Sequence, residues 1–233
     1  DNPNFNIYSA KKHIISLEGN LGGIINPVYD AEDAFIAAQN LRWRWSDGQT
    51  ETFSGNRISL GAGMNYEFMF SRNFGVRGSY VYGVTNHTIS VGDGKNHDTK
   101  STGGHLFRTH GFLLGGSFKM WLSRAHAIIL DIPLQIGLNA GTYYPLVAYT
   151  QARDDLGYSL SVLAQERTAV YSWGFRTRAG VFITGLSPFS IMYSSVGVFY
   201  DYASNGGQFP LNQNGGTSAM QIIYFQYAVG IFL

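Results

Sequence analysis

The chain has 233 residues, no cysteine and a formal net charge of +1, which gives no indication of a nucleic-acid or strongly acidic partner. Charged residues make up 13% of it, well below the roughly one quarter that is usual in soluble proteins. No run of about 20 apolar residues occurs, so the sequence excludes a helical membrane protein. Mean hydropathy near zero, with 15% aromatic residues, favours a membrane β-barrel whose strands alternate between lipid and a polar interior.

The first strand is predicted at residues 13–25, where two kinds of side chain alternate. Leu17 and Leu21 lie on one face, and Glu18 and Asn20 lie on the other. A period of two is the signature of a strand with two unlike faces. We expect the apolar face to point outward and the polar face to point into a barrel.

Polar sequence surrounds this strand on both sides. Residues 1–12 are expected to form a short periplasmic lead of a mature chain whose export signal has been removed or is not shown. Residues 26–56 form a long polar connection. Within it, Asp30 is a candidate N-cap for a short helix at 31–39, and residues 43–50 are a candidate hairpin tip.

The next two predicted strands, 57–70 and 74–90, are joined by a tight turn at 71–73. Reflecting one strand onto the other about Arg72 brings both apolar stripes to the same face, as the register of a hairpin requires. The reflection predicts these outward pairs: Phe70 with Phe74, Phe68 with Val76, Met64 with Tyr80, and Leu60 with Val84.

A second predicted hairpin follows the polar, glycine-rich segment 91–105, which we expect to be a loop. One strand continues to Trp121, a short turn occupies 122–126, and the next strand starts at Ala127. Reflection about the turn pairs Met120 with Leu130 and Phe118 with Ile132. Pro133 falls on the inner face of a central strand, where it cannot donate a ladder hydrogen bond, so a local bulge is expected there.

The strand from Ala127 is expected to continue to Arg153, to turn at 154–157 and to return over 158–183. Both strands are far longer than the roughly 10 residues that a bilayer requires. We therefore expect residues 139–169 to project beyond the membrane as a hairpin.

The remaining sequence predicts a short turn at 184–188, a strand at 189–203, a loop at 205–216 and a last strand at 219–233. Both faces of the 189–203 strand are apolar, so its orientation is left open. The last strand alternates clearly, with Phe225 and Val229 among its outward residues.

Eight antiparallel strands result, and their connections alternate between short and long. The whole pattern, including a last strand that alternates up to Phe232 and Leu233, resembles the small eight-stranded outer-membrane barrels of the OmpA, OmpX and OmpW type. The resemblance implies an all-β, up-and-down, membrane-spanning barrel at 13–233. It also implies a location in a bacterial outer membrane with both termini in the periplasm, where the short turns lie.

Charged residues in the predicted strands fall on inward positions. Because the interior of an eight-stranded barrel is only wide enough for side chains to fill it, these charges are expected to form ion pairs that plug the lumen. The register places Glu67 opposite Arg77 and Lys119 opposite Asp131. The competing interpretation is a gated pore or a proton path. The predicted lumen charges are Glu18, Glu67, Arg77, Lys119, Asp131, Arg176 and Arg178.

The outward positions predict a lipid-facing surface with an aromatic girdle at each edge. The girdle at the side of the short turns is expected to contain Phe70, Phe74, Trp121 and Phe189, and the other girdle Tyr80, Tyr82, Tyr143, Tyr144, Tyr171 and Trp173. The predicted lipid-facing residues are Leu60, Met64, Phe68, Phe118, Ile132, Leu134, Phe225 and Val229.

The sequence offers little support for catalysis or for a bound cofactor. The histidines around the third loop have no regular ligand spacing, so no metal site is predicted. His126 near Ser123, and His110 near Thr109, are the only local hints of a lipid-acting enzyme, and neither has a nearby acid. We therefore expect no catalytic residues and no cofactor, with a lipid-modifying enzyme as the minority alternative.

The leading functional hypothesis is a structural or interaction barrel, or an accessory subunit of an outer-membrane complex, with lipid and other outer-membrane proteins as partners. A narrow OmpW-like channel for small hydrophobic molecules is the alternative. A soluble lipocalin-like carrier would need the opposite orientation, with Glu67 and Lys119 outside. Exposed tyrosine and tryptophan are enriched at interfaces. The candidate partner contacts are Trp43, Trp45, Tyr143, Tyr144 and Tyr149.

Overall fold

A computed structural model describes residues 12–24, 52–92, 100–123, 127–153, 159–163, 170–187, 191–204 and 219–233. These residues form nine antiparallel strands. The strands are β1 His13–Ile24, β2 Thr52–Met69, β3 Phe74–Gly92, β4 Lys100–Ser123, β5 Ile128–Arg153, β6 Ser159–Leu163, β7 Val170–Leu186, β8 Met192–Ser204 and β9 Ala219–Phe232. Within these ranges, no helix is long and apolar enough to cross a membrane.

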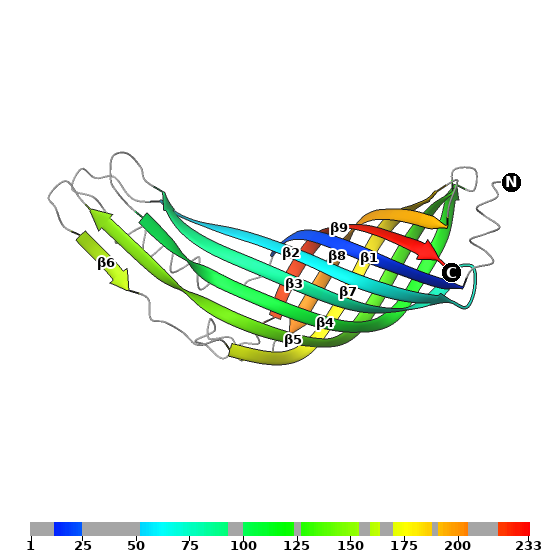
Figure 1. Cartoon of the computed structure of the whole chain (residues 1–233), viewed down its shortest axis with the longest axis horizontal. Helices are drawn as coiled ribbons and strands as arrows, with labels where there is room; N and C mark the ends of the chain where they lie inside the picture. Colours follow the sequence, from blue (N-terminus) through cyan, green and yellow to red (C-terminus); the bar gives the residue numbers. More distant parts are fainter. Residues whose placement is uncertain are drawn as a thin grey trace.

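Eight of the strands close into a barrel, which Figure 1 shows from the side. Each strand from β1 to β4 pairs with the next one in sequence, β5 pairs with β7, and β7 to β9 again pair in sequence. Strand β9 then pairs with β1 and closes the ring, from the pair Ile14 and Phe232 to the pair Ile24 and Ile222. The ninth strand, β6, pairs with β5 outside the closed ring. The predicted eight-stranded up-and-down barrel, and the fold that the resemblance to small outer-membrane barrels implied, are confirmed.

The barrel wall has an apolar exterior and a mixed, largely polar interior. On β5, Leu134, Ile136 and Leu138 are each more than 60% exposed, whereas Gln135, between the first two, and Asn139, after Leu138, are buried. The predicted register is also confirmed, since Met64 pairs with Tyr80 and Phe118 pairs with Ile132. This orientation is the reverse of a lipocalin, so the soluble-carrier alternative is wrong.

The apolar exterior matches the thickness of a membrane. On β5 it runs from Ile128 to Leu138, ten residue-to-residue steps of about 3.4 Å each, or about 34 Å along the strand. At a strand tilt of about 40° this corresponds to about 26 Å of height, close to the roughly 25 Å apolar band of membrane barrels. An exposed apolar surface of this extent, wrapped around the wall, requires lipid to cover it.

One end of the barrel carries the short connections. Four residues separate β2 from β3, four separate β4 from β5, and five separate β7 from β8, and all three connections lie at the end where β1 begins and β9 finishes. The start of β1 and the C-terminus are drawn at this side of the molecule in Figure 1. The alternation of short and long connections is therefore as predicted.

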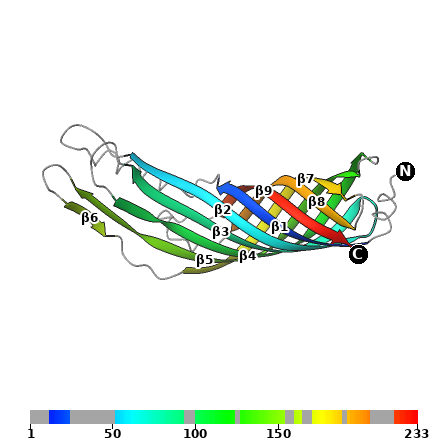
Figure 2. The same cartoon turned by 45° about the horizontal axis from the view of Figure 1, so that its top comes forward.

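At the opposite end, the wall continues on one side far beyond the closed ring. The last β1 pairs are Gly23 with Ile58 of β2 and Ile24 with Ile222 of β9, yet β2 and β3 remain paired as far as Thr52 and Gly92. Strands β4, β5 and β6 extend beside them, and Figures 1 and 2 show the resulting open sheet projecting from the barrel. We call this sheet, formed by residues 52–57, 87–92, 100–105, 145–153 and 159–163, the projecting sheet.

The projecting sheet corrects three expectations. The segment 91–105 is not wholly a loop, because β4 already begins at Lys100. The projection is a five-stranded sheet, whereas a lone hairpin at 139–169 was expected. The predicted return strand 158–183 is divided into β6 and β7, and the register with β5 differs by one residue between them.

Pro133 corrects a fourth expectation. The β4–β5 ladder is regular through Ser117 and Pro133, and the β5–β7 register is the same on both sides of this residue. No bulge is present. Only the pairing of Ile132 and Pro133 with β7 is missing, because proline has no N–H to donate.

Several other predictions lie outside the described residues. They are the lead at 1–11, the helix at 31–39, the hairpin tip at 43–50, the turn at 154–157 and the loop at 205–216.

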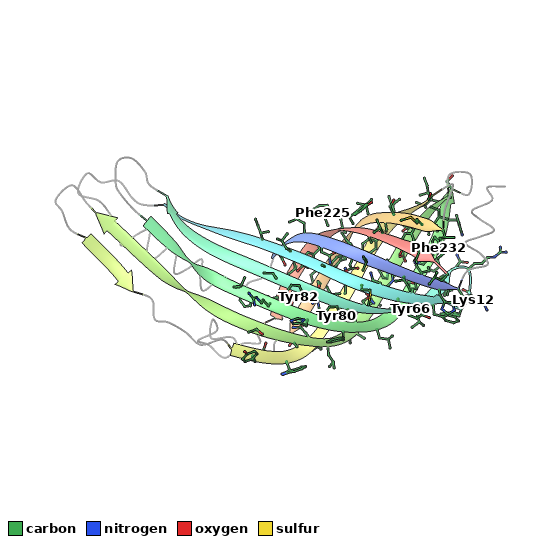
Figure 3. The ribbon with its side chains drawn as sticks, in the orientation of Figure 1. Lys12, Tyr66, Tyr80, Tyr82, Phe225 and Phe232 are labelled. Atoms are coloured by element: carbon green, nitrogen blue, oxygen red, sulfur yellow. The ribbon has the colours of Figure 1, made fainter. Side chains whose placement is uncertain are left out.

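The aromatic girdles are partly as expected. Phe70 and Phe74 are exposed and stack with their ring centroids 6.4 Å apart. Tyr80, predicted for the opposite girdle, is exposed and is labelled on the wall in Figure 3. Trp121 differs, because it pairs with the inward-facing Ile129 and packs against the buried cluster inside the barrel. The placement of Trp121 in the girdle at the side of the short turns was therefore wrong, while Phe189 lies outside the described residues.

Candidate functional site

The centre of the lumen holds four charged side chains from four consecutive strands. Glu67 on β2, Arg77 on β3, Lys119 on β4 and Asp131 on β5 are all buried. Arg77 contacts Glu67 at 2.8 Å and Asp131 at 2.5 Å, and Lys119 contacts the same two carboxylates at 3.1 and 2.9 Å. Ser117 adds a hydrogen bond to Glu67. Each acid therefore meets both bases, and the group, which we call the four-charge cluster, is neutral.

Two further ion pairs lie on the opposite wall. Arg178 of β7 contacts Glu18 of β1 at 2.7 Å, and its guanidinium lies 3.6 Å from the centre of the Phe199 ring. Arg176 of β7 contacts Asp201 of β8 at 2.5 Å. With the four-charge cluster, the buried charges of the described lumen total four acids and four bases. Burial of ions is tolerated only when they are paired in this way.

All seven predicted lumen charges lie inside the barrel, but the sequence reasoning missed Asp201. It lies on β8, the strand whose orientation was left open. The available signal was Arg176, which otherwise had no acid to pair with. Because Thr177 and Arg178 of β7 pair with Tyr202 and Asp201 of β8, a reflection about the 187–191 connection would have placed Asp201 on the inner face.

Side chains also cross the lumen between distant strands. The Tyr224 hydroxyl of β9 lies 2.5 Å from the Ser59 hydroxyl of β2, which in turn lies 2.8 Å from the Thr85 hydroxyl of β3. Gln135 of β5 donates to the Ser79 hydroxyl of β3 at 2.7 Å. The Tyr224–Ser59 and Gln135–Ser79 contacts each pass over one intervening strand, so these side chains fill the lumen, whereas Ser59 and Thr85 lie on paired strands.

Glycine makes room for one of the largest interior side chains. A Cβ built on Gly111 of β4 would lie 2.9 Å from Nη1 and 3.0 Å from Cδ of Arg176, which reaches it from β7. Arg176 is only 2% exposed. The guanidinium therefore lies directly against the backbone of another strand, a close approach that only glycine permits.

Two apolar clusters complete the interior. One lies at the end with the short connections, where Trp121 and Tyr193 pack against its members. Its members are Ile14, Met69, Ala127, Ile129, Leu186 and Phe232. The other lines the inner wall on β7, β8 and β9 and reaches β4 across the lumen. Its members are Phe107, Phe182, Phe199, Met220, Ile222 and Tyr224. The first cluster fills the lumen with apolar side chains at the end with the short connections.

The predicted lipid-facing residues lie on the outer surface. Leu134 and Phe225 are about two-thirds exposed, at 65% and 66%, and Phe225 is labelled on the wall in Figure 3. The remaining members are exposed or half-buried on the same surface: Leu60, Met64, Phe68, Phe118, Ile132 and Val229. No charged side chain interrupts β5 between Ile128 and Leu138 on this face.

The candidate partner contacts lie partly outside the described residues and partly on β5. Trp43 and Trp45 lie outside the described residues, and for Tyr143, Tyr144 and Tyr149 the structure describes only backbone, as part of β5. Tyr143 pairs with Val170 at the edge of the closed ring, and Tyr149 pairs with Leu163 in the projecting sheet.

The local hints of an enzyme do not assemble. Thr109 is buried in the lumen, whereas the imidazole of His110 lies on the outer wall, 2.8 Å from the Tyr80 hydroxyl. His126 lies outside the described residues. Among the residues that are described, no group of three histidine, cysteine, aspartate or glutamate side chains is placed to hold a metal ion.

No protein-family model matches the sequence, and a comparison with curated proteins finds no match. Among solved structures, the chain is similar to the attachment invasion locus protein Ail of Yersinia pestis, with 10% identity, a TM-score of 0.44 and coverage of 96% of this chain and 99% of that one. It is also similar to the outer membrane protein OprG from Pseudomonas aeruginosa, with 13% identity, a TM-score of 0.40 and coverage of 96% and 97%. The strand pairing of this chain establishes the architecture by itself.

Proposed function

We propose that the protein is an integral outer-membrane barrel with an occluded lumen that holds the projecting sheet outside the cell, where it binds another envelope or surface protein. In this proposal the barrel is an anchor and the projecting sheet is the interaction element. The observation that carries it is the combination of a filled interior with a sheet that extends well beyond the membrane-spanning ring.

The filled interior supports an anchor more than a channel. Arg77, Lys119 and Arg176 each lie against a carboxylate in the narrow interior, and the Tyr224 side chain reaches across to Ser59. An open aqueous pore would leave such groups hydrated and apart. An apolar cluster at the end with the short connections adds a barrier that hydrated ions would have to cross.

The projecting sheet supports an interaction role because it exceeds what membrane spanning requires. Strand β5 has 26 residues, whereas about 10 are enough for a bilayer. Its added length is not needed to close the ring, since β5 and β7 separate after Tyr143 and Val170. Exposed sheets carry unpaired backbone groups at their edges, which are ready sites for another strand.

The orientation belongs to the same proposal. Short turns of outer-membrane barrels lie in the periplasm and long connections lie outside. By this rule, the end at which β1 begins and β9 finishes faces the periplasm, and the projecting sheet faces the exterior. The opposite orientation would place the sheet in the periplasm and its partner there. Neither catalysis nor a cofactor forms part of the proposal.

The test is to remove the part of the sheet that β5 and β6 contribute. Deleting residues 144–169 and joining Tyr143 to Val170 by a two-residue turn retains every β5–β7 pair. Heat-modifiable gel migration is expected to persist, because the membrane-spanning ring is intact. A partner recovered with the full chain from native membranes in mild detergent is expected to be lost.

A control substitution at the other end strengthens the test. Replacing Ser71 and Arg72 by Asn-Gly changes a short turn without touching the projecting sheet, so partner recovery is expected to be unchanged. Retention of the partner by the deletion variant would overturn the proposed role of the sheet, and would move the contact surface to the barrel wall or to other loops.

A further inference from the structure

The four-charge cluster contains one oxygen whose hydrogen-bonding capacity is unused. Asp131 accepts from Arg77 and Lys119 through Oδ2, while its Oδ1 has no hydrogen-bond partner among the described residues. The side chain is only 7% exposed. A buried carboxylate oxygen without a donor is costly, because it has lost its contacts with water and has gained nothing in exchange.

A small cavity adjoins this carboxylate. Its volume is ≈ 10 Å³, about the space that one water molecule needs. It lies between the four-charge cluster and the apolar cluster at the end with the short connections. The lining residues are Ile14, Lys119, Ile129, Asp131, Thr184, Tyr193 and Phe232.

Four of the residues that line the cavity carry polar groups. These groups are the Asp131 carboxylate, the Lys119 ammonium and the hydroxyls of Thr184 and Tyr193. The ammonium has three N–H donors, and its contacts with Glu67 and Asp131 use two of them. The Thr184 hydroxyl donates to Ser195 at 3.0 Å, so its oxygen can still accept.

The chemistry of the lining selects the class of ligand. A cation would meet the Lys119 ammonium, and an anion would meet the Asp131 carboxylate, so the site disfavours both signs of charge. The four-charge cluster is already neutral and calls for no counter-ion. The volume excludes anything much larger than water. What remains is a neutral molecule that both donates and accepts hydrogen bonds.

We propose that this cavity is a binding site for a single buried water, which donates to Asp131 Oδ1 and to Thr184 Oγ1 and accepts from Lys119 Nζ. The water completes the hydrogen bonding of the four-charge cluster and links it to β7. Asp131 and Thr184 lie on neighbouring strands, no hydrogen bond is assigned between their side chains, and the water joins them. Ile129 and Phe232 supply apolar lining beside it.

The test is a crystal structure of the full chain at a resolution that shows ordered waters, determined from sodium chloride and again from rubidium bromide. The expected result is one density peak within about 2.7–3.1 Å of Asp131 Oδ1, unchanged between the two salts and without anomalous signal. Rubidium or bromide signal at the peak would overturn the proposal in favour of an ion site. An empty cavity would overturn it outright.

Solution NMR of the barrel in detergent provides a second measurement. A water cross-peak to the Ile129 and Thr184 methyl groups is expected, because both residues line the cavity. Thr184→Val is expected to weaken this cross-peak at Ile129 at least severalfold, since it removes one hydrogen-bond acceptor. Ser195→Ala is the matched control, because it removes the Thr184–Ser195 bond but leaves the Thr184 oxygen in place. Equal cross-peaks in both variants would contradict the assigned role of Thr184.

Discussion

Replacing Glu67 by glutamine tests whether the lumen charges are shielded from water. Glu67 accepts from Arg77 Nη2 at 2.8 Å and Nε at 3.2 Å, and it lies 3.1 Å from Lys119 Nζ. The amide keeps the size of the side chain and removes its charge. Two bases then share the single carboxylate of Asp131, and the group carries one uncompensated positive charge in a narrow, filled interior.

The structure sets the expected size of this effect. Glu67 is 2% exposed, and both of its basic partners are buried. Removing one partner of a buried ion pair costs about 3–5 kcal/mol, because the remaining charge is left without compensation. The measurement is the free energy of unfolding of the barrel in lipid vesicles from urea titration, with gel migration reporting the folded fraction.

A double-mutant cycle separates this electrostatic effect from lost packing. Lys119→Met alone leaves an excess negative charge and is also expected to cost about 3–5 kcal/mol. The double variant Glu67→Gln/Lys119→Met restores neutrality and keeps the Arg77–Asp131 contact of 2.5 Å. Its cost is therefore expected to be at least about 2 kcal/mol less than the sum of the two single changes. Costs below about 1 kcal/mol for both single variants, typical of solvated ion pairs, would refute the occluded lumen.

Other predictions concern the barrel wall and the hydrogen bonds inside it. Leu134→Arg, in the middle of the exposed apolar face of β5, is expected to destabilise the folded barrel by about 2–4 kcal/mol in the same assay. Phe70→Arg, beside a short turn, is expected to cost about 0–1 kcal/mol. Equal costs for the two variants would argue against a membrane around this apolar band. Tyr224→Phe leaves the buried Ser59 hydroxyl with one partner fewer and is expected to cost about 1–3 kcal/mol, whereas Tyr227→Phe on the outer surface should stay within about 0.5 kcal/mol.

The sequence predicted the fold well where two conditions were met. The strand pairs β2–β3 and β4–β5 alternate clearly and are each joined by a short connection, so a reflection about Arg72 or about the 122–126 turn fixes their register. The predicted opposition of Glu67 with Arg77, and of Lys119 with Asp131, followed from this register. A shift by one residue would have turned every apolar side chain to the other face, and so the register had no close competitor.

Alternation was a weaker guide where one of these conditions failed. On β8, apolar residues occur on both faces: Val196 and Val198 are exposed, while Phe199 is buried against Tyr224. Alternation therefore could not orient the strand, and Asp201 was missed. Trp121 was misplaced even though the reflection about the 122–126 turn already pairs it with Ile129, as the structure does. It follows the outward-facing Met120, so alternation alone places its side chain inside the barrel.

The projecting sheet could not be predicted from hydrophobic pattern. Residues 100–105 are Lys-Ser-Thr-Gly-Gly-His, a composition typical of a loop. They form a strand because β3 and β5 lie on either side and supply backbone hydrogen bonds, which do not depend on an apolar face. Tertiary pairing therefore decided the conformation where local sequence preference pointed elsewhere.

The most direct test of the occluded lumen is a conductance recording of the purified barrel in a planar lipid bilayer. Paired charges that meet across the interior, with an apolar cluster of Ile14, Ile129 and Phe232 beneath them, predict no large, steady ion conductance. The Glu67→Gln variant, recorded in parallel, shows whether breaking the four-charge cluster opens a path. Large and steady conductance from the unmodified chain would contradict the account and would favour a transport function.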